Sequence, residues 1–206
     1  MNKLEPIVYI LDNNWITLDS LSWIINTIGL KVKTYSESQH FLKDYDPKKP
    51  GCLVLDVNMP NINGLEVQQI ILSRGDPPIP IIFISDYDDI LLAVRGIKSG
   101  ALDFMLKPLN EYLFLENINK AIQFDKANRD KIQLISQIKS KFINLSLREK
   151  QILQGIIDGK SNKEISLDIN VSLKTVEAHR ASLMKKMNTK SVSTLIKLFY
   201  SVGNVC

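Results

Sequence analysis

Four short, nearly continuous apolar segments constrain the fold of this chain more than any other feature of its sequence. They are PIVYIL at 6–11, CLVL at 52–55, IPIIFI at 79–84 and LDFML at 102–106. Apolar runs of this length favour strands of a parallel sheet that is covered on both faces. A fifth, more polar strand is predicted at 31–35, where the sequence reads KVKTY.

Helical patterns separate these strands. Between 16 and 28 the apolar residues recur at intervals of three and four, and Gly29 can end that helix. Further helices are predicted at 64–73, 87–99 and 110–124. Strands that alternate with helices predict an α/β domain with a five-stranded parallel, flavodoxin-like sheet over residues 1–124.

A polar residue follows each of the four apolar strands. These residues are Asp12, Asp56, Ser85 and Lys107. Because the carboxyl ends of parallel strands meet at one edge of the sheet, we expect the four side chains to lie close together. Two carboxylates, a hydroxyl and an ammonium favour transfer of a phosphoryl group to a carboxylate. Asp56 would be the nucleophile, a divalent cation would bind the acids, and Lys107 and Ser85 would contact the phosphoryl group.

This half of the chain resembles the receiver domain of two-component response regulators. The resemblance rests on LDNN at 11–14, LDVNMPNINGLE at 55–66, FIS at 83–85 and KP at 107–108. It implies that Asp56 is the phosphoacceptor and that Mg²⁺ is bound by Asp12, Asp56 and the backbone carbonyl of Asn58. It also implies that Ser85 and Phe104 rearrange together on activation, and that Lys107 and Pro108 are joined by a cis bond.

Two residues depart from the family pattern. The family places a second acid next to the first, whereas this chain has Asn13, whose amide can bind a cation but adds no charge. Asp86 stands where the family prefers a small residue. Its carboxylate could repel an incoming phosphoryl group or replace the charge missing at Asn13. Because the Asn13 amide adds no charge, we expect Mg²⁺ to bind more weakly.

The charge is distributed unevenly. Residues 1–120 carry 11 Lys and Arg against 15 Asp and Glu, and residues 121–206 carry 15 against 7. A basic second half is typical of a domain that binds a phosphate-rich partner. A polar helical linker is predicted at 125–142, continuing from the last receiver helix, and a small all-α domain at 143–206.

Two Ser-x-x-Glu segments, SLRE at 146–149 and SNKE at 161–164, predict capping boxes that begin two short helices. A turn at NVS, a third helix from Ser172 to about Met187 and a last helix at 191–201 follow. This arrangement predicts a helix-turn-helix. The segment NKEIS…VSLKTVEAHRASLMKKM resembles the LuxR-type DNA-binding domain, and both halves together resemble the NarL/FixJ family.

The resemblance assigns roles for binding double-stranded DNA. Glu177, Ala178 and Ala181 align with base-facing positions. Phosphate contacts are expected from Lys163, Lys174, Thr175, Arg180, Lys185 and Lys186. His179 either packs within the domain or touches the DNA backbone. A stripe on the last helix is expected to serve dimerisation, domain packing or both; it consists of Val192, Leu195, Ile196 and Phe199.

These features predict a DNA-binding transcriptional regulator that a sensor histidine kinase switches by phosphorylating Asp56, and that forms a homodimer when active. The alternative is a regulator whose receiver works without phosphate. A phosphatase is disfavoured, because Asn14 and Asn58 stand where such enzymes often carry a second acid. Cys52 and Cys206 form no disulfide or zinc pattern, and we expect a cytoplasmic protein without a signal peptide or membrane span.

Overall fold

The computed structural model describes residues 4–75 and 77–203, so Cys206 lies outside the described residues. The chain divides into two compact units, with the division between residues 129 and 130. The N-terminal unit contains β1 (Ile7–Leu11), β2 (Lys31–Tyr35), β3 (Gly51–Asp56), β4 (Ile81–Ser85) and β5 (Asp103–Leu106). Its helices are α1 (Trp15–Thr27), α2 (Ser38–Asp44), α3 (Gly64–Ser73), α4 (Ile90–Lys98) and the first part of α5 (Glu111–Ile143).

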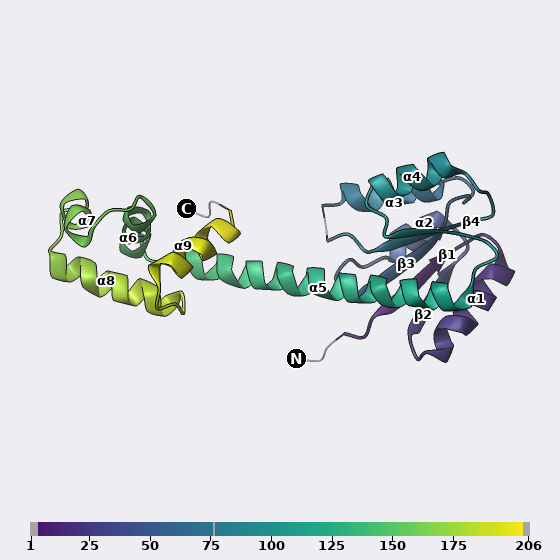
Figure 1. Ribbon diagram of the computed structural model, residues 1–206, viewed down its shortest axis with the longest axis horizontal. Coiled ribbons are helices and arrows are strands. Elements are labelled where there is room, and N and C mark those ends of the chain that lie inside the picture. The colour runs from purple at the N-terminus through teal and green to yellow at the C-terminus, as the bar shows by residue number, and fades with distance from the viewer. Residues whose placement is uncertain (1–3, 76, 204–206) are drawn as a thin grey trace. The chain divides into compact units, whose positions relative to one another are not determined.

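The five strands form one parallel sheet in the order β2-β1-β3-β4-β5. Figure 1 labels β1 to β4 of this sheet. Successive residues of a strand face opposite sides, and both sides of the central strands β1, β3 and β4 are buried. Tyr9, Leu11 and Leu53 pack on one side with α2 and α3. Val8, Ile10 and Val54 pack on the other side with α1 and α5. Burial on both faces explains why these strands are continuously apolar, and it confirms the predicted fold class.

Local capping determines where several helices begin. Asp89 accepts hydrogen bonds from the N–H groups of Leu91 and Leu92, so α4 begins at Ile90 and not at the predicted residue 87. Asn63 and Glu66 form a capping box at the start of α3. Helix α2 was absent from the sequence prediction. It has only seven residues, and Glu37 at its start makes no side-chain capping bond.

The predicted linker at 125–142 is part of one continuous helix, α5. At the first residue of that predicted linker, the buried carboxylate of Asp125 accepts from the N–H of Gly51 at 3.0 Å and from Nε of Arg129 at 2.7 Å. The Arg129 guanidinium also donates to the carbonyls of Pro47 and Lys49, both at 2.9 Å. These bonds attach residues 125–129 to the N-terminal unit, so that unit extends beyond residue 124.

The C-terminal unit contains the end of α5 and four further helices. These are α6 (Leu147–Ile157), α7 (Asn162–Asp168), α8 (Leu173–Lys186) and α9 (Val192–Ser201). Both predicted capping boxes, Ser146 with Glu149 and Ser161 with Glu164, are present. The core includes Phe142 from α5, Leu153 from α6, Val176 from α8 and Phe199 from α9. In the part of the chain that the structure describes, no helix has the length and apolar character needed to cross a bilayer.

Candidate functional site

The predicted polar strand ends converge at one edge of the N-terminal sheet. Asp12 follows β1, Asp56 ends β3 and Ser85 ends β4, and all three are buried. The register pairs Leu11 with Leu55, Asp56 with Ile84 and Ser85 with Leu106. Asp12 and Asp56 therefore lie level, and Ser85 and then Lys107 each lie one residue further along. The Lys107–Pro108 peptide bond directly after β5 is cis.

Lys107 joins the acids of this edge. Its Nζ lies 2.7 Å from Oδ2 of Asp12 and 3.4 Å from Oδ2 of Asp56. A third carboxylate, that of Asp86, lies 3.2 Å from the same nitrogen. The ammonium therefore neutralises part of the charge of three acids. Asp12 follows β1, Asp56 ends β3 and Asp86 lies in the loop after β4.

Burial and charge together alter the protonation of this cluster. Burial, followed by the negative charge of Asp12, raises the pKa of Asp56 above its ordinary value, while the Asn58 N–H and Lys107 oppose the shift. Burial by itself would lower the pKa of Lys107. The hydrogen bond to Asp12 and the charges of Asp56 and Asp12 outweigh it, so the pKa of Lys107 is raised and the ammonium stays charged at neutral pH.

Backbone N–H groups hold the second oxygen of each buried acid. The N–H of Asn14 donates to Oδ1 of Asp12 at 2.7 Å, and the N–H of Asn58 donates to Oδ1 of Asp56 at 3.2 Å. The Asn14 side chain in turn caps α1 by accepting from the N–H of Ile16. The two neutral residues after Asp12 thus differ. Asn14 shapes the loop and begins the helix. Asn13 is exposed.

Asp12 and Asp56 place two buried carboxylates at this edge, and carboxylate oxygens are hard donors that fit Mg²⁺. Asn13 adds no charge to this set. Within residues 4–75 and 77–203, no group of three or more His, Cys, Asp and Glu side chains is placed to hold a metal.

Ser85 and Phe104 each have a described partner outside the acid cluster. The Ser85 hydroxyl accepts from the N–H of Tyr87 and donates to its carbonyl, both at 3.1 Å. The half-buried Phe104 packs against Phe83 with ring centroids 6.4 Å apart. In this state the hydroxyl stabilises the loop after β4, and the aromatic ring belongs to the edge of the core.

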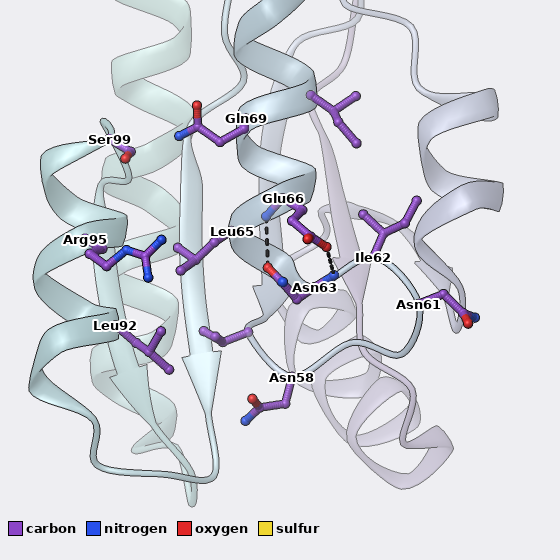
Figure 2. A pocket seen from close by; sticks show the side chains of 12 residues that line it. Asn58, Asn61, Ile62, Asn63, Leu65, Glu66, Gln69, Leu92, Arg95 and Ser99 are labelled. Atoms are coloured by element: carbon purple, nitrogen blue, oxygen red, sulfur yellow. Dashed lines mark hydrogen bonds between the residues drawn. The ribbon is translucent and has the colours of Figure 1, made fainter.

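A cavity of about 780 Å³ opens beside the acceptor strand, between α3 and α4. Figure 2 shows Asn58 and Arg95 on its walls, with the capping-box bonds between Asn63 and Glu66. This cavity was absent from the sequence prediction, because side-chain packing between two helices creates it and no motif encodes it.

In the C-terminal unit, α8 presents the predicted DNA-contacting side chains. Lys174, Glu177, Ala178 and Ala181 are exposed on one face, whereas Val176, Leu183 and Met187 are buried in the core. Lys163 and Lys185 are also exposed, and Thr175 and His179 are half-buried. The sequence pattern therefore placed the solvent face of this helix correctly.

Two predicted phosphate contacts have partners inside the unit. Arg180 donates to the side-chain oxygen of Asn162 at 2.7 Å. Lys186 forms an ion pair with Glu149 at 2.7 Å, and Ser182 donates to the other oxygen of Glu149 at 2.8 Å. Burial by itself would raise the pKa of Glu149, but these bonds and those from Ser146 lower it to about 2. The sequence indicated Glu149 only as a capping residue, because its contacts with α8 are long-range.

The stripe on α9 divides between two environments. Leu195 and Phe199 are buried in the core, and the Phe199 ring meets that of Phe142 edge to face at 5.7 Å. Because they are buried, Leu195 and Phe199 are not available for contact with another molecule in this state. Only the other two residues of the predicted stripe could then serve dimerisation. Val192 and Ile196 are only partly buried and remain accessible.

Comparison with known proteins matches both units. Residues 8–119 match the response regulator receiver domain, and residues 143–199 match the luxR family of bacterial regulatory proteins. The response regulator protein TmoT of Ectopseudomonas mendocina is 40% identical over 198 residues, which cover 96% of this chain and 90% of TmoT. The transcriptional regulatory protein FixJ of Rhizobium meliloti is 32% identical over 95% of this chain and 96% of FixJ.

Solved structures give the same result. The structure of the response regulator StyR aligns with a TM-score of 0.85 and 34% identity over 94% of this chain and 98% of StyR. Full-length FixJ from B. japonicum aligns with a TM-score of 0.59 and 31% identity over 98% of each chain. The chain therefore belongs to the NarL/FixJ family of two-component response regulators, which join a receiver domain to a LuxR-type DNA-binding domain.

Proposed function

We propose that a sensor histidine kinase phosphorylates Asp56 and thereby controls DNA binding by the C-terminal domain in the cytoplasm. The observation that carries this proposal is the contact of one ammonium, that of Lys107, with both buried acids, Asp12 and Asp56. A carboxylate removed from water and placed beside a fixed positive charge is suited to attack a phosphorus atom.

In the proposed reaction an oxygen of Asp56 attacks the phosphorus of the donor. The bond between that phosphorus and the donor nitrogen or oxygen breaks, and the donor leaves with the bonding electrons. Lys107 supplies positive charge to the phosphoryl oxygens. When bound, Mg²⁺ neutralises further charge on that group. Asp12, Asp56 and the carbonyl of Asn58 would hold the ion, and Asn13 makes this binding weaker than in relatives with a second acid.

Phosphorylation would act through a shift between two states. For Ser85 to reach the phosphoryl group, its hydroxyl must leave the Tyr87 backbone, and Phe104 must then repack beside it. We propose that the second state forms homodimers, with Val192 and Ile196 contributing from α9. A dimer presents two recognition helices to two half-sites and so raises DNA affinity.

The test is the intact mass of the full chain after incubation with acetyl phosphate and Mg²⁺. We expect the mass of one phosphoryl group to be added to the wild type and none to Asp56→Asn. The alternative is a receiver that has kept the fold but works without phosphate, and Asn13 favours it. An unmodified wild type under conditions that modify a related regulator, and also with its kinase, would establish that alternative.

DNA binding predicts a contrast between two exposed residues of α8. Lys174→Ala is expected to weaken binding to specific and random DNA alike and to reduce the slope of log K against log salt by about one, because one phosphate contact is lost. Glu177→Ala is expected to change the preference at one base pair. Titrations over a range of salt measure both, with Lys197→Ala on α9 as a control for charge. Equal losses on both kinds of DNA for Glu177→Ala would contradict base reading.

A further inference from the structure

The loop after β4 places a carboxylate on the lysine of the phosphorylation site. Asp86 Oδ2 lies 3.2 Å from Nζ of Lys107, closer than the 3.4 Å of Asp56 Oδ2. The two acids differ in their surroundings, because the Asp86 side chain is 60% exposed and that of Asp56 only 3%. Asp86 can therefore leave Lys107 and be hydrated by solvent, whereas Asp56 has no such freedom.

Lys107 has no hydrogen bond left to give in this state. A lysine ammonium has three N–H donors, and Lys107 contacts three carboxylates, those of Asp12, Asp56 and Asp86. A phosphoryl group on Asp56 brings new oxygens that require one of these donors. The bond to Asp12 is the shortest, and that acid is buried, so breaking it would leave an unpaired charge without water. The Asp56 contact, at 3.4 Å, is the longest and can pass to the phosphoryl group on the same residue. A second donor for that group comes from the contact with Asp86, which solvent can replace.

We propose that Asp86 is a built-in competitor of the phosphoryl group for Lys107 and slows phosphorylation of Asp56. It acts in two ways that reinforce each other. Its charge repels a phosphoryl donor that carries negative charge of its own, and its oxygen occupies the donor that the phosphoryl group needs. The inference rests on the proposed function, since it concerns the rate at which the same site reacts.

The experiment is a time course of intact mass for the full chain with acetyl phosphate and Mg²⁺. The variants are Asp86→Asn, which keeps size and removes charge, and Asp86→Ala, which removes both. Asp88→Asn is the matched control, because Asp88 is an exposed acid of the same loop, two residues away. We expect both Asp86 variants to react about fivefold faster than the wild type, and Asp88→Asn to match the wild type. The advantage should shrink between about 0.05 M and about 0.5 M salt, because salt screens exposed charges.

The outcomes separate this inference from the proposed function. A reacting wild type that Asp86→Asn does not accelerate would overturn the inference and leave the proposed function intact. Acceleration by Asp86→Ala alone would show that size and not charge limits the reaction, which also overturns it. If neither the wild type nor any variant reacts with acetyl phosphate or with the kinase, both fail. A wild type that acetyl phosphate leaves unmodified while Asp86→Asn reacts would support the inference in its strongest form, and reaction of the wild type with its kinase would then decide the proposed function.

Discussion

Replacement of Gly51 by alanine is expected to unfold the receiver domain. Gly51 begins β3 at a φ of +152°, and a Cβ atom there would lie 1.8 Å from the carbonyl oxygen of Ile7 on the neighbouring strand. That atom is backbone in the middle of the sheet, so relief requires β1 and β3 to separate. The same shift would break the hydrogen bond from the Gly51 N–H to Asp125. We expect a loss of more than about 4 kcal/mol in the free energy of unfolding, which is in the range reserved for severe core defects.

Hydrogen exchange followed by mass spectrometry of peptides in urea measures this loss separately for each domain. Gly29→Ala is the matched control, because Gly29 also has a positive φ, +74°, but has nothing within 4 Å of its added Cβ. Its cost should be about 1 kcal/mol, the conformational cost alone. Similar values for the two variants would show that the close approach of Gly51 to Ile7 does not determine the stability of this sheet.

Glu149→Ala is expected to destabilise the DNA-binding domain by roughly 3 kcal/mol. The buried carboxylate accepts from Ser146 at the start of α6 and from Ser182 and Lys186 on α8. The substitution therefore removes a capping bond and the two polar contacts that Glu149 makes with α8. We also expect weaker DNA binding, because α8 loses a contact that fixes its position against α6.

The same method measures this effect, with Glu164→Ala as the control. Glu164 occupies the equivalent position in the capping box of α7 but is exposed, so its loss should cost only about 1 kcal/mol. The Glu149 effect should also depend on pH. The pKa of Glu149 is lowered to about 2 in the folded domain from its ordinary 4.5. Its contribution is therefore complete above about pH 4.5 and declines as the pH falls towards 2. If the loss of unfolding free energy caused by Glu149→Ala does not become smaller as the pH is lowered, the role of the Glu149 charge is contradicted.

Sequence patterns predicted the elements that carry local signals. The continuous apolar strands and the capping boxes at Ser146 and Ser161 all lie where expected, because each depends on residues only a few positions apart. Helix α2 was missed for the same reason: it is short and lacks a capping bond. The extension of the first domain to Arg129 was also missed, since it depends on bonds across about eighty residues of chain.

The site shows the same division. The strand-end rule correctly brought together Asp12, Asp56 and Lys107. It could not show that Asp86 turns towards Lys107, because a loop side chain has several staggered rotamers and only its surroundings select one. Likewise, Lys186 resembled a DNA contact by its place in the motif, and only the folded chain reveals its partner Glu149.

Both tryptophans of the chain, Trp15 and Trp23, lie on α1, and both are largely exposed. The chain thus contains a natural optical probe that is confined to one domain. Light emitted after selective tryptophan excitation originates from the receiver alone, and the DNA-binding domain remains dark. Trp15 is also the first residue of the helix capped by Asn14, whose N–H holds Asp12. An unlabelled sample therefore has one of its two tryptophan fluorophores only three residues from a candidate cation ligand, attached to it through a single loop.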